Sequence, residues 1–133
     1  MSGEEAGQGL AECLRNKQEL RILNLDNNNI GEVGALAISK NLKKISGLQK
    51  LFLDLNHIGP KGAEAISEAI YGMNGLLKLC LENNDIGDIG AKALAKSLEA
   101  NPNMVALYLE NNALTDECSV DLSVMFTNKP KMW

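Results

Sequence analysis

The sequence predicts an α/β solenoid of stacked strand-plus-helix repeats. An eleven-residue phrase occurs four times, beginning at residues 20, 48, 76 and 104, so each copy follows the last by 28 residues. A fixed period of this size is typical of stacked repeats. Each phrase also alternates apolar and polar residues, and a helix-like apolar pattern follows it. We expect a horseshoe segment with a parallel sheet of about four strands on its concave face and about five helices on its convex face.

Each repeat is expected to begin with a short strand. In the first phrase Leu23 and Leu25 alternate with Ile22 and Asn24, and the later phrases repeat this arrangement. Alternation at period 2 indicates a strand with the leucines in the core and the intervening residues pointing outward. Equivalent strands that pair side by side would lie about 4.8 Å apart.

A turn is expected after each strand. Gly31, Gly59 and Gly87 stand three residues beyond the asparagine of the phrase, and Thr115 holds this place in the fourth repeat. Glycine suits a turn that a side chain would obstruct.

A helix is expected in the second half of each repeat. It is predicted to begin at a further glycine, three residues on, in each of three repeats: Gly34, Gly62 and Gly90. The apolar residues at 35, 38 and 42 recur 28 and 56 residues later, which is the spacing of one helix face. We expect Gly47, Gly75 and the turn at 101–103 to end these helices.

The phrases follow the pattern L-x-x-L-x-L-x-x-N-x-I/L, and the chain thereby resembles the leucine-rich repeat proteins. Its 28-residue strand-plus-helix unit is similar to the ribonuclease-inhibitor-like subclass. In this family the asparagine of the phrase bonds the backbone of the turn that leaves the sheet. The resemblance therefore implies a structural ladder rather than a catalytic role for four residues: Asn28, Asn56, Asn84 and Asn112.

A single domain is expected for a chain of 133 residues. Its predicted parts are an N-terminal half-repeat or cap helix (4–19), three full repeats (20–47, 48–75, 76–103) and a degenerate C-terminal repeat with a tail (104–133). Solenoid ends need caps, because each repeat buries its faces only against neighbours. The expected caps are helices at 4–15 and 116–127, with Trp133 either a lid or a free tail residue. Alternatively the chain is a piece of a longer array, whose open ends would favour self-association.

Composition excludes several partners and locations. The net charge is −4 and the only arginines are Arg15 and Arg21, so nucleic acid, which needs clustered basic residues, is not an expected partner. No apolar run approaches the roughly 20 residues of a membrane span, and the acidic, glycine-rich N-terminus does not resemble a signal peptide. The three scattered cysteines, Cys13, Cys80 and Cys118, are expected to be reduced, apolar fillers in a cytoplasmic or nuclear protein.

No catalytic residue, metal or cofactor is expected. The single histidine, His57, lies in a loop without a defined partner, and neither G-x-x-x-x-G-K-[ST] nor G-x-S-x-G occurs. Carboxylates at repeat spacing are too far apart for one tight cation site, and no glycine-rich calcium loop is present.

The outward positions of the four strands predict three rows on the sheet. These are Ile22, Lys50, Lys78 and Ala106; then Asn24, Phe52, Cys80 and Tyr108; then Asp26, Asp54, Glu82 and Glu110. Carboxylates about 5 Å apart raise one another's pKa and form a negative stripe. Together with exposed aromatic rings, this favours a groove for a protein or basic peptide. The other interpretation is that the acidic row only keeps the sheet soluble.

The predicted function is therefore a non-enzymatic protein-interaction module. Its predicted partner-binding residues are Asp26, Asp54, Glu82, Glu110, Phe52, Tyr108, Lys50, Lys78 and Asn24. Two relatives imply alternatives. Ran GTPase-activating protein is similar in repeat length but relies on a loop arginine, which the equivalent loops (29–34, 57–62, 85–90, 113–118) lack. The C-terminal half of tropomodulin is similar as a short array that ends in an actin-contacting helix.

Overall fold

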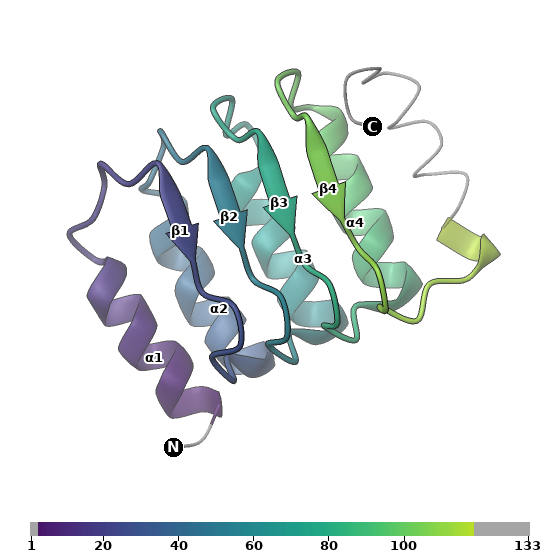
Figure 1. Ribbon diagram of the computed structural model, residues 1–133, viewed down its shortest axis with the longest axis horizontal. Coiled ribbons are helices and arrows are strands. Elements are labelled where there is room, and N and C mark those ends of the chain that lie inside the picture. Colours follow the sequence, from purple (N-terminus) through teal and green to yellow (C-terminus); the bar gives the residue numbers. More distant parts are fainter. Residues whose placement is uncertain (1–2, 119–133) are drawn as a thin grey trace.

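The computed structural model describes residues 3–118 of the chain. Within these residues strands and helices alternate, as Figure 1 shows. The helices are α1 (Gly3–Leu14), α2 (Gly31–Leu42), α3 (Gly59–Ile70), α4 (Gly87–Glu99) and the short 3₁₀ helix η1 (Asp116–Cys118). The strands are β1 (Ile22–Asn24), β2 (Lys50–Phe52), β3 (Lys78–Cys80) and β4 (Ala106–Tyr108).

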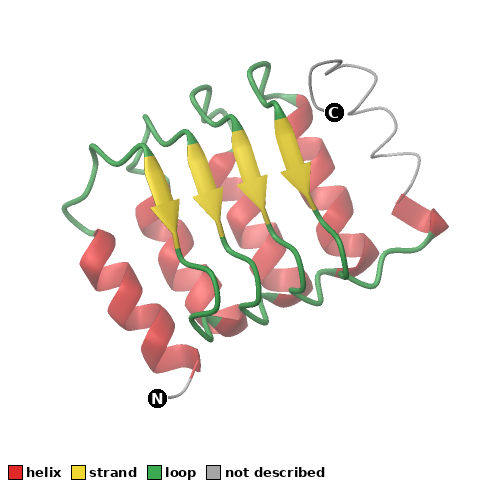
Figure 2. Ribbon diagram, viewed as in Figure 1, coloured by secondary structure: helices red, strands yellow, loops and turns green. Residues whose placement is uncertain are grey.

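The strands form one parallel sheet in the order β1-β2-β3-β4, and the helices form a second layer behind it (Figure 2). Every residue pairs with the one 28 positions later; for example, Leu23 pairs with Leu51 and Leu51 with Leu79. The predicted four-strand parallel sheet with helices on one side is confirmed. Because the register never slips, residues distant in the sequence lie in straight rows across the sheet.

The core fills the space between the two layers. The inward leucines of the central strands, Leu51 and Leu79, are completely buried, as are Ile58 and Ile86 in the turns that follow. Small residues let the helices approach closely. A Cβ added to Gly62 would lie 3.1 Å from the Ala35 Cβ of the neighbouring helix, so a larger residue there would push α2 and α3 apart.

The predicted helix starts are wrong, and so are the predicted ends of α2 and α3, whereas α4 ends at Glu99, next to the predicted turn at 101–103. The helices begin at Gly31, Gly59 and Gly87, three residues before the predicted starts. These turn glycines have φ values of 69 to 71° and are already the first residues of the helices. At the other end, α2 stops at Leu42 and its last turn is closed by the Lys43 N–H, so Gly47 lies beyond the helix, against Arg21.

The number of helices also differs from the expected five. The structure describes four α-helices within residues 3–118, and α1 occupies the predicted N-terminal helical segment. Of the predicted helix at 116–127, only Asp116–Cys118 is described, as a 3₁₀ turn. The remainder and Trp133 lie outside the described residues.

Candidate functional site

The sheet face, defined here as the outward side chains of β1–β4 and of the residue two positions after each strand, carries the three predicted rows. Lys50 pairs with Lys78 in the first row, and Phe52 pairs with Cys80 in the second. Backbone pairing continues beyond the strands, since the Leu55 N–H donates to the Glu82 carbonyl at 3.0 Å. Because the backbone pairing extends past the strands, the residues of the third row also lie side by side. All predicted partner-binding residues therefore lie on the sheet face.

The acidic row consists of two structurally different halves. One carboxylate oxygen of Asp26 accepts the backbone N–H of Asp54 at 2.7 Å, and one of Asp54 accepts that of Glu82 at 2.8 Å. These aspartates therefore tie each repeat to the next. Glu82 and Glu110 make no side-chain hydrogen bond or ion pair with the described residues. The two glutamate carboxylates are therefore not committed to bonds within the described residues, which the sequence alone did not reveal.

The pKa values of Asp54 and Glu82, the two central residues of the acidic row, are both raised. The pKa of Asp54 is raised from 3.8 by desolvation first and then by Asp26 and Glu110, although its hydrogen bond from Glu82 acts in the opposite direction. The pKa of Glu82 is raised from 4.5 by desolvation and then by Asp54 and Glu110. Desolvation is thus the largest single cause for both groups, and the charge repulsion that the sequence predicted adds to it.

Lys78 occupies the centre of the sheet face, between two aromatic rings. Its Nζ lies 5.3 Å from the centroid of the Phe52 ring and 5.4 Å from that of Tyr108. Both separations are within the range of a cation–π interaction. Cys80 is paired between the same two aromatic residues and is buried. The sheet face is therefore not simply acidic, because the ammonium group of Lys78 lies at its middle, between the two aromatic rings.

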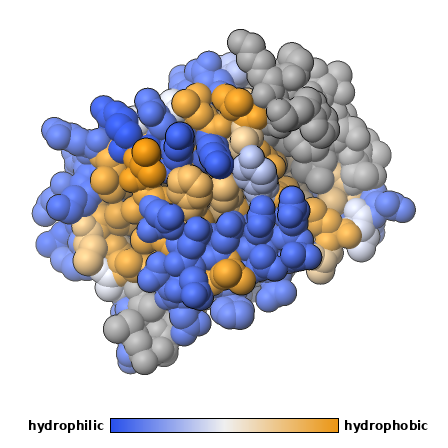
Figure 3. Space-filling view, viewed as in Figure 1, coloured by the Kyte–Doolittle hydropathy of each residue, from blue (hydrophilic) through white to orange (hydrophobic). Residues whose placement is uncertain are grey.

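The charges of the sheet face are not neutralised within the described part of the chain. The ion pair found there joins Arg15 to Glu12 on α1, away from the sheet. Neither Lys50 nor Lys78 forms an ion pair with any residue of 3–118. Figure 3 shows a hydrophilic band across this face with apolar patches beside it. Unpaired charges in fixed rows are available to a partner.

The asparagine ladder runs beneath the acidic row. Asn56, Asn84 and Asn112 are buried. The Oδ1 of Asn84 accepts the backbone N–H groups of Asn56 at 2.8 Å and Ile58 at 3.4 Å, while its Nδ2 donates to the Leu53 and Glu82 carbonyls. Buried amides of this kind must be satisfied, and here they join adjacent turns.

Asn28 differs from the other members of the ladder. It is exposed, and its Nδ2 donates only to the carbonyl of Asp26 in its own turn. Asn28 thus bonds the backbone of its own turn, as the resemblance implied, but unlike Asn56 it bonds no earlier turn. The physical reason is that no described strand precedes β1, so Asn28 has no earlier turn to bond.

Asn24, the remaining predicted contact residue, is also exposed at the edge of the sheet. Its Oδ1 accepts the backbone N–H of Asp26 at 3.0 Å, so part of its bonding capacity is used locally.

Leu55 is a surface residue that sequence analysis missed. Its φ is 60°, in the left-handed region, where the equivalent residues of the other repeats are Asn27, Asn83 and Asn111. Leucine rarely adopts this conformation, and asparagine tolerates it. The side chain is half exposed. The signal in the sequence was that Leu55 stands where the other three repeats have asparagine.

A second missed feature fastens η1 to α4. The carboxylate of Asp88 accepts the backbone N–H of Thr115 at 2.8 Å and also the Thr115 hydroxyl. These bonds lower the pKa of Asp88 below 3.8. Thr115, predicted only as a replacement for a turn glycine, is thus an anchor for the chain after β4.

The cysteines are free thiols, but they are not equivalent. Cys80 and Cys118 are buried as predicted, whereas Cys13 is exposed on α1, so the filler interpretation is wrong for Cys13. Burial and the nearby Asp54 raise the pKa of Cys80 to about 11, which keeps this thiol protonated.

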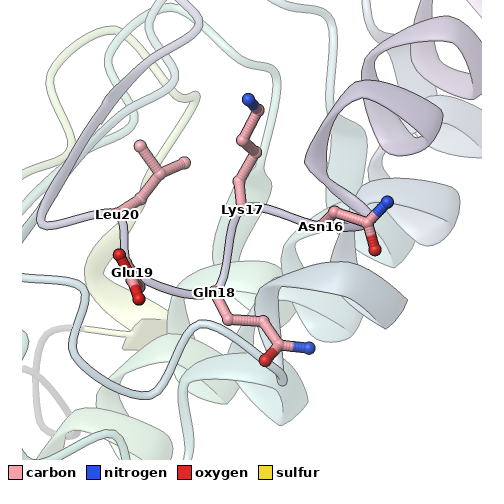
Figure 4. Close-up of a pocket in the computed structure, with 5 residues that line it drawn as sticks. All are labelled: Asn16, Lys17, Gln18, Glu19 and Leu20. Atoms are coloured by element: carbon pink, nitrogen blue, oxygen red, sulfur yellow. The ribbon is translucent and has the colours of Figure 1, made fainter.

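Besides the sheet face, a small cavity of about 170 Å³ lies between α3 and α4, lined by Ser67, Glu68, Tyr71, Ala93, Lys96 and Ser97. A surface cavity of about 430 Å³ is lined by the consecutive residues Asn16 to Leu20 (Figure 4). Their side chains point in different directions, whereas ligand pockets need converging polar groups. Among residues 3–118 no cluster of His, Cys, Asp or Glu could hold a metal ion, and no helix has the length and apolar character to cross a bilayer. His57 is exposed in its loop.

Comparisons with known proteins agree with the fold. A family model described as a leucine-rich repeat matches residues 16–39, 48–67 and 75–95. No curated protein matches the chain. Among solved structures, the chain is similar to leiomodin-1 actin-binding site 2, with a TM-score of 0.75 and 24% identity over 94% of this chain and 72% of that one. With this architecture and three matched repeats, the chain is a leucine-rich repeat solenoid.

Proposed function

We propose that the chain is a non-enzymatic protein-interaction module and that its sheet face binds another protein. The supporting observation is the row of unpaired carboxylates at Glu82 and Glu110 beside the aromatic residues Phe52 and Tyr108. Exposed aromatic groups surrounded by charge are the usual composition of interface hot spots. The fold favours this function, since leucine-rich repeat solenoids mainly present extended surfaces.

The proposal also covers the subclass, the domain limits and the cellular location of the protein. The 28-residue unit supports an assignment to the ribonuclease-inhibitor-like subclass, and we propose one domain over residues 1–133 with the repeat limits given above. We propose a cytoplasmic or nuclear location on the basis of the free thiols. Self-association through the outer edges of the sheet is a separate prediction, which light scattering over a range of concentrations tests.

Crosslinking capture with mass spectrometry tests the sheet face. Glu82→Lys/Glu110→Lys reverses two unpaired charges without removing a side-chain hydrogen bond. The matched control is Glu64→Lys/Glu68→Lys, which makes the same charge change on exposed positions of α3. We expect the first variant to lose the captured partner and the control to keep it. Equal capture by both variants would contradict the proposal.

A second candidate is binding to actin, in the manner of a cytoskeletal protein. The observation that favours it is the similarity in fold to leiomodin-1 actin-binding site 2. Cosedimentation with filamentous actin and fluorescence titration of monomeric actin test it directly. If neither form of actin binds, this candidate fails while the general interaction module stands. GTPase activation is not proposed, because the loops that leave the sheet carry no arginine.

A further inference from the structure

We propose that the sheet face receives an amphipathic helix lying across the four strands, with an acidic flank over Lys50 and Lys78 and a basic flank over Glu82 and Glu110. This assignment depends on the sheet face being the partner-binding surface, and it names the kind of partner. It also replaces the basic peptide expected from the sequence with a segment that carries both charges on opposite sides.

The layout of charge is the first reason. The lysine row and the acidic row lie four residues apart along each strand, which corresponds to about 13 Å. They have opposite signs, and neither row is neutralised by the described residues. A uniformly basic partner would meet Lys50 and the central ammonium of Lys78, and like charges brought together at an interface are unfavourable.

The dimensions of the face are the second reason. An α-helix with its side chains is about 10–12 Å wide, which is comparable to the roughly 13 Å between the backbone positions of the two charged rows. Such a helix directs side chains toward both charged rows and toward the sheet beneath it at the same time. An extended segment directs alternate side chains toward the sheet and away from it, so it cannot reach both rows. The three intervals between four strands span about 14 Å, the length of roughly ten helical residues.

The middle row supplies the contact beneath such a helix. Phe52 and Tyr108 flank Lys78, and Tyr108 remains 38% exposed. Ile22, which lies beside Lys50 at the β1 end of the first row, is 55% exposed. These side chains offer apolar surface at the centre and at one end, while the ammonium of Lys78 provides a specific place for a carboxylate from the acidic flank.

Three synthetic 18-residue helical peptides test the assignment by fluorescence anisotropy at low salt. All carry one leucine face. The polarised peptide has Glu on one flank and Lys on the other, the mixed peptide has the same composition with both charges on both flanks, and the basic peptide has Lys on both. We expect the polarised peptide to bind at least ten-fold more tightly than the other two.

Charge-reversed variants give a sharper result. Lys50→Glu/Lys78→Glu and Glu82→Lys/Glu110→Lys should each weaken binding of the polarised peptide at least ten-fold. Combining all four substitutions exchanges the signs at these four positions, while Asp26 and Asp54 keep theirs, and binding should recover at least in part because the helix can lie in the reverse direction. Lys50→Glu alone, which disturbs no contact with Phe52 or Tyr108, should weaken binding without changing the melting temperature.

The outcomes separate this inference from the proposed function. Equal binding of the polarised and mixed peptides, tightest binding of the basic peptide, absence of peptide binding or failure of the four-fold variant to recover would each overturn the helix assignment. The sheet-face proposal would survive these results if Glu82→Lys/Glu110→Lys still lost the captured partner. It would fail only if that variant and the Glu64→Lys/Glu68→Lys control captured the partner equally.

Discussion

The carboxylate of Asp54 accepts the backbone N–H of Glu82 at 2.8 Å, across one full repeat. The two residues hold equivalent positions in the acidic row, but of the two only the aspartate bonds the backbone of the next repeat. Glu82 makes no corresponding bond to Glu110, so its carboxylate is directed to other uses. The row therefore combines a structural half with a half available for binding.

Replacing these two residues by alanine should have different effects on stability. Asp54→Ala leaves the Glu82 N–H without its acceptor and is expected to lower the free energy of unfolding by about 1 kcal/mol. Glu82→Ala removes no side-chain hydrogen bond within the described structure and should change it by less than about 0.5 kcal/mol. Urea unfolding of both variants measures the difference. Equal losses would show that the Asp54 bond does not stabilise the stack.

The raised pKa of Glu82 predicts a pH-dependent effect of Glu82→Gln. The folded chain holds the Glu82 proton more tightly than the unfolded chain, whose group titrates near 4.5. This stabilisation is complete below the unfolded pKa and is lost as the pH rises through the raised folded pKa. At pH 7 the variant should therefore melt at a higher temperature than the parent, and the gap should close below pH 4.5.

A control separates this effect from a general loss of negative charge. Glu19→Gln removes the same charge from an exposed position in the loop before β1, outside the acidic row. Its melting temperature should follow that of the parent at both pH values. A pH-independent gap for Glu82→Gln would contradict the prediction.

The asparagine ladder predicts unequal costs at equivalent positions. Asn84→Ala removes the acceptor of the Asn56 N–H and the donor to the Leu53 carbonyl, all in a buried site. Unsatisfied buried groups cost about 1–3 kcal/mol each, so the loss should exceed that of Asn28→Ala by at least about 2 kcal/mol. Chemical denaturation of the two variants checks this, and similar losses would show that the ladder contributes little.

The fold was predictable because the same pattern of leucine and asparagine positions recurs in every repeat. The constant spacing that places Leu23, Leu51 and Leu79 in one row also fixes the strand order and register, without any knowledge of distant contacts. The helix starts were predicted less well. Gly31 has a φ of 69°, and a sequence pattern that marks such a glycine as a turn does not reveal that the helix already begins there.

The rows of the site were also predictable, but their bonding was not. Alternation places Lys78 on the sheet face, whereas its position between Phe52 and Tyr108 depends on how its long side chain bends. Likewise, the sequence gives Asp54 and Glu82 the same charge and the same row. The hydrogen bond that Asp54 accepts from the neighbouring backbone, which Glu82 lacks, separates the two residues.

The anchor between Asp88 and Thr115 should protect Cys118. The Thr115 hydroxyl and N–H both donate to the Asp88 carboxylate, and Cys118 lies buried three residues later. In a Cys13→Ser background, which removes the exposed thiol, Thr115→Val should increase the rate of Cys118 alkylation several-fold. Thr115→Ser keeps the hydroxyl and should react at the parental rate. Unchanged rates in the valine variant would show that the anchor does not hold this turn closed.

The left-handed backbone of Leu55 predicts that asparagine is better tolerated there than alanine. Both substitutions remove the same half-exposed apolar contact, so their difference reports the backbone alone. Asparagine occupies this place at φ values of 56 to 58° in the other three repeats. A left-handed residue with a Cβ costs about 1–2 kcal/mol, which asparagine reduces, so Leu55→Asn should be about 1 kcal/mol more stable than Leu55→Ala in urea unfolding. Equal stabilities would mean that the turn relaxes to another conformation when Leu55 is replaced.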